Sequence, residues 1–110
     1  MSTLHLTLHR RWFIDILEGT KTEEYREIKP FWAKRLLKHY DRITFRNGYA
    51  SDAPTMTVEY RGHQIKEIMH PITNRMEVVF ALKLGRILHT ENCDKLVSDK
   101  QLSMALEYKG

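Results

Sequence analysis

Three charged side chains between Gly19 and Arg26 have the types and spacing that ligand binding needs. Lys21 supplies a mobile point charge, Glu24 an acceptor or a base, and Arg26 a planar fork of donors. In a strand, Glu24 and Arg26 would lie on one face, two residues apart, with Lys21 at the start of the strand. Such a group can hold an anionic or amide-bearing ligand. The competing interpretation is a solvated edge strand, whose opposite charges pair with one another and keep partners away.

A second polar group follows later in the chain, from Thr44 to Tyr49. Thr44 and Arg46 would share one face of a strand, and Asn47 and Tyr49 would lie in the loop that leaves it. The asparagine amide offers donors and acceptors to a base edge, and a tyrosine ring can stack on a base. The alternative is a hairpin turn with the tyrosine as a lid over the core.

The sequence gives little support for a metal site, a reactive cysteine or a phosphate-binding loop. The six histidines stand at positions 5, 9, 39, 63, 70 and 89. His5 and His9 have a spacing of four, but on a strand they would lie roughly 13 Å apart, too far for one ion. Cys93 has no basic neighbours of the kind that activate a thiolate, and no glycine-rich phosphate loop occurs. We therefore expect neither a metal site nor a cofactor.

The elements that position these residues are indicated by hydrophobic spacing in the first half of the chain. Alternating leucines predict a strand over Leu4–Leu8, and helical spacing predicts a helix over Arg10–Glu18 that Gly19 ends. A charged strand over Lys21–Ile28 follows. Pro30 then opens a second helix over Phe31–Lys38, with Phe31, Leu36 and Leu37 on its apolar side. The aromatic residues Trp12, Phe13, Phe31 and Trp32 are expected in the core, with Trp12 or Trp32 also able to border a cleft.

Strands dominate the second half of the chain. Alternation predicts them over Arg42–Arg46 and Thr55–Tyr60, with a turn at Arg61-Gly62 before a further strand over His63–Ile68. The most apolar strand, Val78–Leu84, extends toward Leu88. This order predicts an α+β fold, a small mixed sheet or barrel with helices packed at its ends.

Length and composition limit the class of protein. The 110 residues predict one domain over residues 1–90 and a tail over residues 91–110, weakly helical from Lys95 to Tyr108. The net charge of +4, from 18 basic and 14 acidic residues, is compatible with a polyanionic partner. No apolar run is long enough for a membrane span, and the single cysteine fits a reducing, cytoplasmic setting. The oligomeric state stays open.

The charged segment resembles the motif of the ASCH family, domains named for homology to an activating signal cointegrator. The family motif, Gly-x-Lys-x-x-Glu-x-Arg after the first helix, is matched here by Gly19, Lys21, Glu24 and Arg26. The order of the surrounding elements is similar from Leu4 to Leu88. The stretches over residues 44–49 and 53–58 resemble a small bacterial and phage-associated subgroup of the family.

The resemblance implies a PUA-like fold, a small β-barrel with helices at its openings. It implies an RNA or modified-nucleoside ligand, held in a cationic cleft near the motif. Lys21 and Arg26 would line that cleft with Glu24 beside them, and Thr44, Arg46, Asn47 and Tyr49 are the further candidate ligand-binding residues.

A second interpretation is a hydrolase in the same cleft. Some small ASCH proteins are similar in layout and remove the acetyl group of N4-acetylcytidine, a reaction attributed to a Thr, a Lys and a distal Glu. Lys21 matches the Lys, and Glu24 occupies the position of the Thr, with Thr22 nearby. The distal Glu has three candidates, at positions 59, 67 and 77. Lys21 and Glu24 are then the candidate catalytic residues. For ribonuclease activity, also proposed for a family member, Glu24 or His5 would be the base.

A third interpretation is a protein-interaction module without a small ligand. In that case the segment from Cys93 to Gly110 would form the contact.

Overall fold

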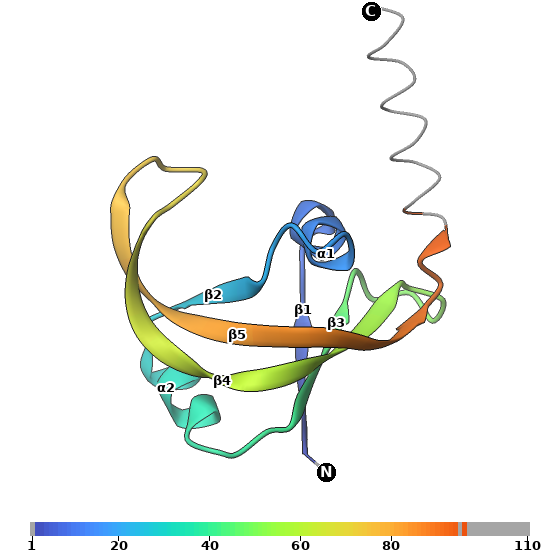
Figure 1. Cartoon of the computed structure of the whole chain (residues 1–110), viewed down its shortest axis with the longest axis horizontal. Helices are drawn as coiled ribbons and strands as arrows, with labels where there is room; N and C mark the ends of the chain where they lie inside the picture. Colours follow the sequence, from blue (N-terminus) through green and yellow to red (C-terminus); the bar gives the residue numbers. More distant parts are fainter. Residues whose placement is uncertain (1, 95, 97–110) are drawn as a thin grey trace, which may run out of the picture.

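The strands of this protein form one mixed sheet, onto which two short helices pack (Figure 1). The structure, a computed structural model, describes residues 2–94 and 96. Its elements are β1 (Thr3–Thr7), α1 (Arg10–Leu17), β2 (Glu23–Glu27), α2 (Pro30–Leu36), β3 (Arg42–Arg46), β4 (Thr55–Met69) and β5 (Met76–Glu91). The predicted α+β class is confirmed.

The order of the strands in the sheet is β1-β3-β4-β5-β2. β1 pairs with β3 in parallel, and the other three pairings are antiparallel. β1 and β2 are thus the two edges of the sheet, and within the described residues no ladder joins them. Both edges carry residues that matter for the site described below.

The core lies where the predicted alternation placed it. Leu4 and Leu6 of β1 and Ile43 and Phe45 of β3 are buried side by side, because their register pairs Leu4 with Ile43 and Leu6 with Phe45. α1 covers this layer with Phe13, which is fully buried. Further core residues are Leu8, Ile16, Leu36, Met56, Val58, Phe80, Leu82, Cys93 and Leu96.

The second helix contributes less to the core than its sequence predicts. α2 ends at Leu36, which is buried, while Leu37 is exposed. Phe31 is 59% exposed and packs edge-on against Trp32, with the ring centroids 5.0 Å apart. Trp32 is the aromatic residue of α2 that packs against the core cluster. The prediction that Phe31 is a core residue is therefore wrong.

The predicted turn at Arg61-Gly62 is also wrong, because β4 continues through it. Gly62 has a φ of +92°, and the β4–β5 register shifts between Tyr60 and His63. A glycine with positive φ beside a register shift is typical of a β-bulge, which bends a strand without ending it. The long β4–β5 hairpin therefore curves, and its loop curls back above β2 (Figure 1).

The folded body extends a few residues past the predicted domain end at position 90. β5 runs to Glu91, and Cys93 and Leu96 are buried in the core cluster. The helix predicted over Lys95–Tyr108 and the protein contact predicted for the tail lie outside the described residues, apart from positions 93, 94 and 96.

Candidate functional site

The loop between α1 and β2 positions Lys21 just before the start of β2. Gly19 has a φ of +83°, the left-handed conformation that ends a helix at low cost. The backbone carbonyl of Asp15 then accepts hydrogen bonds of 3.0 Å from the backbone amides of both Thr20 and Lys21. It also accepts the hydroxyl of Thr20 at 3.0 Å. One carbonyl of α1 thereby fixes the turn that precedes the charged strand.

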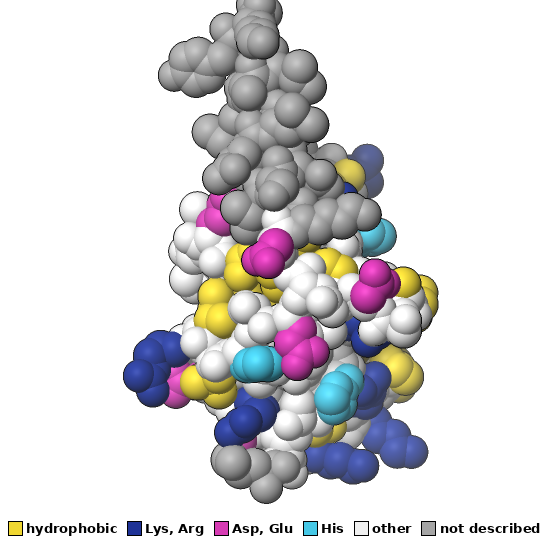
Figure 2. All heavy atoms as spheres, turned by 90° about the vertical axis from the view of Figure 1, so that its right-hand side faces the viewer, with side chains coloured by type: hydrophobic (Ala, Val, Ile, Leu, Met, Phe, Trp, Pro, Cys, Tyr) yellow, Lys and Arg dark blue, Asp and Glu magenta, His cyan; other side chains and the backbone are white. Residues whose placement is uncertain are grey.

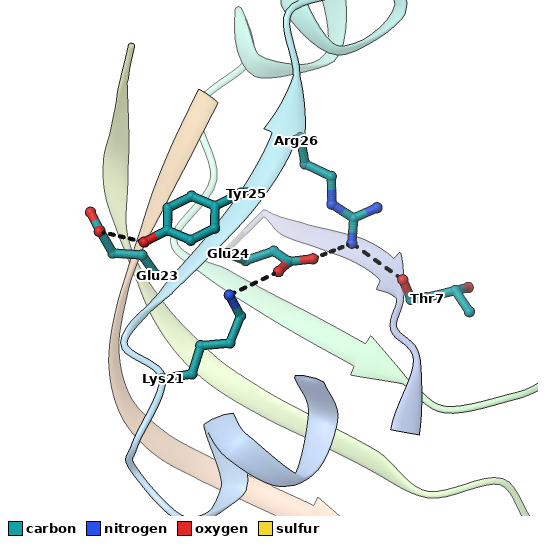
Figure 3. A network of polar contacts seen from close by, with 6 residues as sticks. All are labelled: Thr7, Lys21, Glu23, Glu24, Tyr25 and Arg26. Atoms are coloured by element: carbon teal, nitrogen blue, oxygen red, sulfur yellow. Dashed lines mark hydrogen bonds and ion pairs between the residues drawn. The ribbon is translucent and has the colours of Figure 1, made fainter. Parts of the chain in front are cut away.

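Glu24 lies between the two cations of the motif (Figure 3). Its carboxylate accepts a hydrogen bond of 2.7 Å from the guanidinium of Arg26, and its other oxygen is 3.6 Å from Lys21 Nζ. Only 6% of Glu24 is exposed. A carboxylate buried to this extent needs paired charges to offset its lost hydration, and both partners are present. These three side chains are called the triad below.

Aromatic rings line the cationic ends of the triad. Lys21 Nζ lies 4.5 Å from the ring centroid of Tyr25 and 5.3 Å from that of Trp12. The guanidinium carbon of Arg26 lies 4.9 Å from the ring centroid of Trp32. Cations at these distances are attracted by the ring faces, more strongly where water is excluded. The rings therefore hold both cations in place.

Arg26 also connects the two edges of the sheet. Its guanidinium donates a hydrogen bond of 3.2 Å to the backbone carbonyl of Thr7, the last residue of β1 (Figure 3). A side chain thus links β1 to β2 where no backbone ladder does. Arg26 Nε is buried without a hydrogen-bond partner in the described part of the chain.

The triad lines a pocket of about 1070 Å³ at the gap between these two edges. One wall is β2, all five residues of which contact the pocket. The end of β1, the beginning of α1, the loop after β3 and the tip of the β4–β5 hairpin also line the pocket. The further lining residues are Thr7, Leu8, His9, Arg10, Trp12, Asp15, Thr20, Lys21, Thr22, Trp32, Asn47, Gly48, Tyr49, Met69, His70, Pro71 and Ile72.

Two of the candidate residues after β3 join the triad in this pocket. Asn47 lines the pocket and donates from its side-chain nitrogen to the backbone carbonyl of Leu8 at 2.9 Å. Tyr49 lies at the rim and is 87% exposed. Its ring is therefore not a lid over the core.

The other two candidates, Thr44 and Arg46, lie outside the pocket lining. The hydroxyl of Thr44 is 2.8 Å from that of Thr57 on the neighbouring strand. Arg46 donates from Nε to the backbone carbonyl of Gly48 at 2.8 Å and from its terminal nitrogen to that of Ala50. Arg46 therefore shapes the loop that carries Asn47 and Tyr49.

Of the residues considered for hydrolysis, some line the pocket and others lie outside it. Glu59, Glu67 and Glu77 do not line the pocket, nor does His5. Glu59 instead accepts hydrogen bonds from the backbone amide and the side chain of Arg86. Thr22 does line the pocket, next to Lys21.

Sequence reasoning did not assign Tyr25 or the hairpin tip to the site. The tip lines the pocket through residues 69–72, and the hairpin curves at the β4 bulge. Lys66 of β4 forms an ion pair of 2.8 Å with Glu23, whose carboxylate also accepts the Tyr25 hydroxyl at 3.2 Å. Trp12 and Trp32, the two aromatic residues that the sequence offers for the border of a cleft, both line the pocket.

Burial of Lys21 lowers the pKa of its amine below its ordinary value of 10.5, and the nearby Glu24 carboxylate partly opposes this effect. We expect the Lys21 Nζ titration, followed by NMR, to have its midpoint below 10.5, and Glu24→Gln to lower that midpoint further. Because the unfolded chain binds this proton more tightly, the contribution of Lys21 to stability rises with pH between its folded pKa and 10.5. A wild-type midpoint at or above 10.5 would contradict this account of the site.

One face of the molecule away from the triad can be followed in Figure 2. On the face shown in Figure 2, acidic, basic and histidine side chains are interspersed, so that this face offers no surface of one sign to a polyanion. No cluster of three metal-binding side chains occurs among the described residues. Within the same residues, no helix has the length and apolar character that crossing a membrane requires.

Comparison with models of protein families, with curated proteins and with solved structures finds no match to this chain.

Proposed function

We propose that this chain is an ASCH domain of PUA-like fold whose pocket binds the base of a nucleoside, either free or within RNA. The family assignment rests on the motif residues Gly19, Lys21, Glu24 and Arg26. The observation that carries the function is the convergence of the triad, Trp12, Trp32 and Asn47 around one pocket. A nucleoside or RNA ligand also fits the cytoplasmic setting that the lone cysteine suggests.

The charge balance of the pocket favours a base over a phosphate group as the part that enters. The pocket lining carries four carboxylates, those of Asp15, Glu23, Glu24 and Glu27, and three basic side chains, those of Arg10, Lys21 and Arg26. Glu23 and Glu27 are also paired with Lys66 and Lys29. A phosphate would therefore meet no excess of positive charge in this pocket, whereas an uncharged heterocycle needs none. Lys21 and Arg26 would donate to carbonyl oxygens of the base, and the Tyr49 ring would stack on an exposed face.

The lowered pKa of Lys21 supports hydrolysis of a modified nucleoside as a second candidate function. A buried amine that loses its proton more readily can act as a general base. Lys21 would take a proton from a water that attacks the amide carbonyl, and the same proton would pass through the Glu24 carboxylate to the leaving amine. The C–N bond would then break, and the acyl group would leave as a carboxylic acid. With the Thr22 hydroxyl as the nucleophile, an acyl ester would form first and water would then hydrolyse it. An amide-bearing base such as N4-acetylcytidine is the substrate class that this arrangement fits.

One experiment tests both functions. Purified protein is incubated with a panel of unmodified ribonucleosides, N4-acetylcytidine and short single-stranded RNAs. Binding is followed by thermal shift and product by mass spectrometry. Binding that is lost in Lys21→Ala but kept in Lys38→Ala, whose lysine is exposed and outside the pocket, supports the binding function. Product that depends on Lys21 establishes hydrolysis. Neither binding nor product with any member of the panel would contradict the proposal.

A further inference from the structure

The pocket follows the unpaired edge of β2. Successive side chains of a strand point to opposite faces, so a cavity on one face contacts only alternate residues. This pocket contacts all five consecutive residues of β2, from Glu23 to Glu27. A single cavity contacts every residue in this way when it runs along the edge of the strand. The other edge of β2 is paired with β5.

The hydrogen bonds to β5 show which backbone groups face the pocket. The amide of Leu84 donates to the carbonyl of Thr22 at 3.0 Å, so Thr22 and Leu84 are a hydrogen-bonded pair. In an antiparallel ladder such pairs alternate with pairs whose backbone groups point outward. Glu24 and Arg26, two and four residues on, therefore direct their N–H and C=O groups toward β5. The backbone groups of Glu23, Tyr25 and Glu27 point to the free edge.

Tyr25 is the central residue of this edge and lies among the groups already assigned to the ligand. Its ring is the one that Lys21 contacts, and the triad residues Glu24 and Arg26 adjoin it in the sequence. An extended N–H and C=O from one residue form a donor and an acceptor side by side. This pair is complementary to any planar group with an adjacent acceptor and donor.

The occupant that fits is compact. Arg26 crosses from β2 to the carbonyl of Thr7, so a peptide strand paired along the whole edge would have to displace this link. A group that pairs with Tyr25 alone leaves the Arg26 link in place. Every nucleobase carries an adjacent donor and acceptor on its Watson–Crick edge, and the aromatic walls of the pocket suit its flat faces.

We propose that the backbone N–H and C=O of Tyr25 pair with the Watson–Crick edge of an unpaired nucleobase. This inference rests on the proposed function and specifies its ligand class. Base-paired RNA would be excluded, because a duplex uses the same edge of the base. Single-stranded RNA, a flipped-out base or a free nucleoside would be accepted.

The first test changes the ligand. Affinity for uridine is compared with that for 3-methyluridine, which lacks the N3 donor, and for 5-methyluridine, whose methyl group lies away from this edge. Cytidine is compared in the same way with its N4,N4-dimethyl and 5-methyl derivatives. We expect methylation of the Watson–Crick edge to weaken binding by about tenfold or more, and 5-methylation to change it little. If uridine or cytidine binds and both of its methylated derivatives bind with the same affinity, the inference is overturned but the proposed function stays intact.

The second test changes the protein and uses whichever of the four ribonucleosides binds most tightly. Tyr25→Pro removes the tyrosine side chain and, from the backbone, only an N–H that points away from β5, a position at which an edge strand tolerates proline. Tyr25→Ala is the matched control that loses the side chain but keeps the N–H. We expect the proline variant to bind about tenfold more weakly than the alanine variant. Equal affinity of two folded variants would overturn the inference, and failure of wild type to bind any nucleoside would contradict the proposed function itself.

Discussion

Replacing Glu24 with alanine is expected to lower the free energy of unfolding by about 3 kcal/mol, because it leaves two partly buried cations without their shared partner. Glu24 is the one carboxylate bonded to both Lys21 and Arg26 in the described structure, and it is almost fully buried. Chemical denaturation of the wild type and the variant at neutral pH measures the difference.

Glu27→Ala is the matched control on the same strand. Glu27 is exposed, and its ion pair of 2.9 Å with Lys29 joins two exposed side chains. We expect this substitution to change the free energy of unfolding by no more than about 0.5 kcal/mol. If Glu24→Ala were as stable as Glu27→Ala, the triad would not be a coupled, buried network.

Replacing the whole triad with apolar residues is expected to separate binding from folding. The variant Lys21→Met, Glu24→Leu, Arg26→Met removes all three charges together, so that none is left unpaired. Such replacements of buried ion networks are often neutral or stabilising. We expect a folded protein whose affinity for the nucleoside is weaker by roughly a hundredfold, since about two charge-assisted hydrogen bonds are lost.

Isothermal titration with the tightest-binding nucleoside of the panel measures that loss. Lys38→Met is the control, since it removes an exposed cation outside the pocket and is expected to bind as the wild type does. A folded triple variant that kept wild-type affinity would show that the charges of the motif do not contact the ligand.

Much of the framework could be predicted from local patterns. Alternation with a period of two identifies β1 and β3 correctly, because one face of each is buried and the other is not. The same parity places Glu24 and Arg26 on one face, where their side chains form a hydrogen bond of 2.7 Å. Gly19 ends the first helix as its type predicts.

The parts that could not be predicted depend on long-range geometry. Strand parity predicts that Arg46 and Thr44 share one face of β3. It does not predict that the Arg46 guanidinium donates hydrogen bonds to the backbone carbonyls of Gly48 and Ala50. Trp32 and Phe31 are adjacent aromatic residues, and only the packing of α2 decides that Trp32 contacts Arg26. The hairpin tip reaches the pocket through the bulge at Gly62, which reads as a turn in sequence.

The central claim is that a nucleobase enters the pocket at the free edge of β2. An NMR titration of the isotope-labelled protein with the four ribonucleosides tests it most directly. The account predicts that the backbone amides of Lys21 to Arg26 and the indole groups of Trp12 and Trp32 shift together as ligand is added. Resonances of Thr57 and His89, which pair outside the pocket, should stay in place. Shifts confined to such outer positions, or no shifts with any nucleoside, would contradict the account.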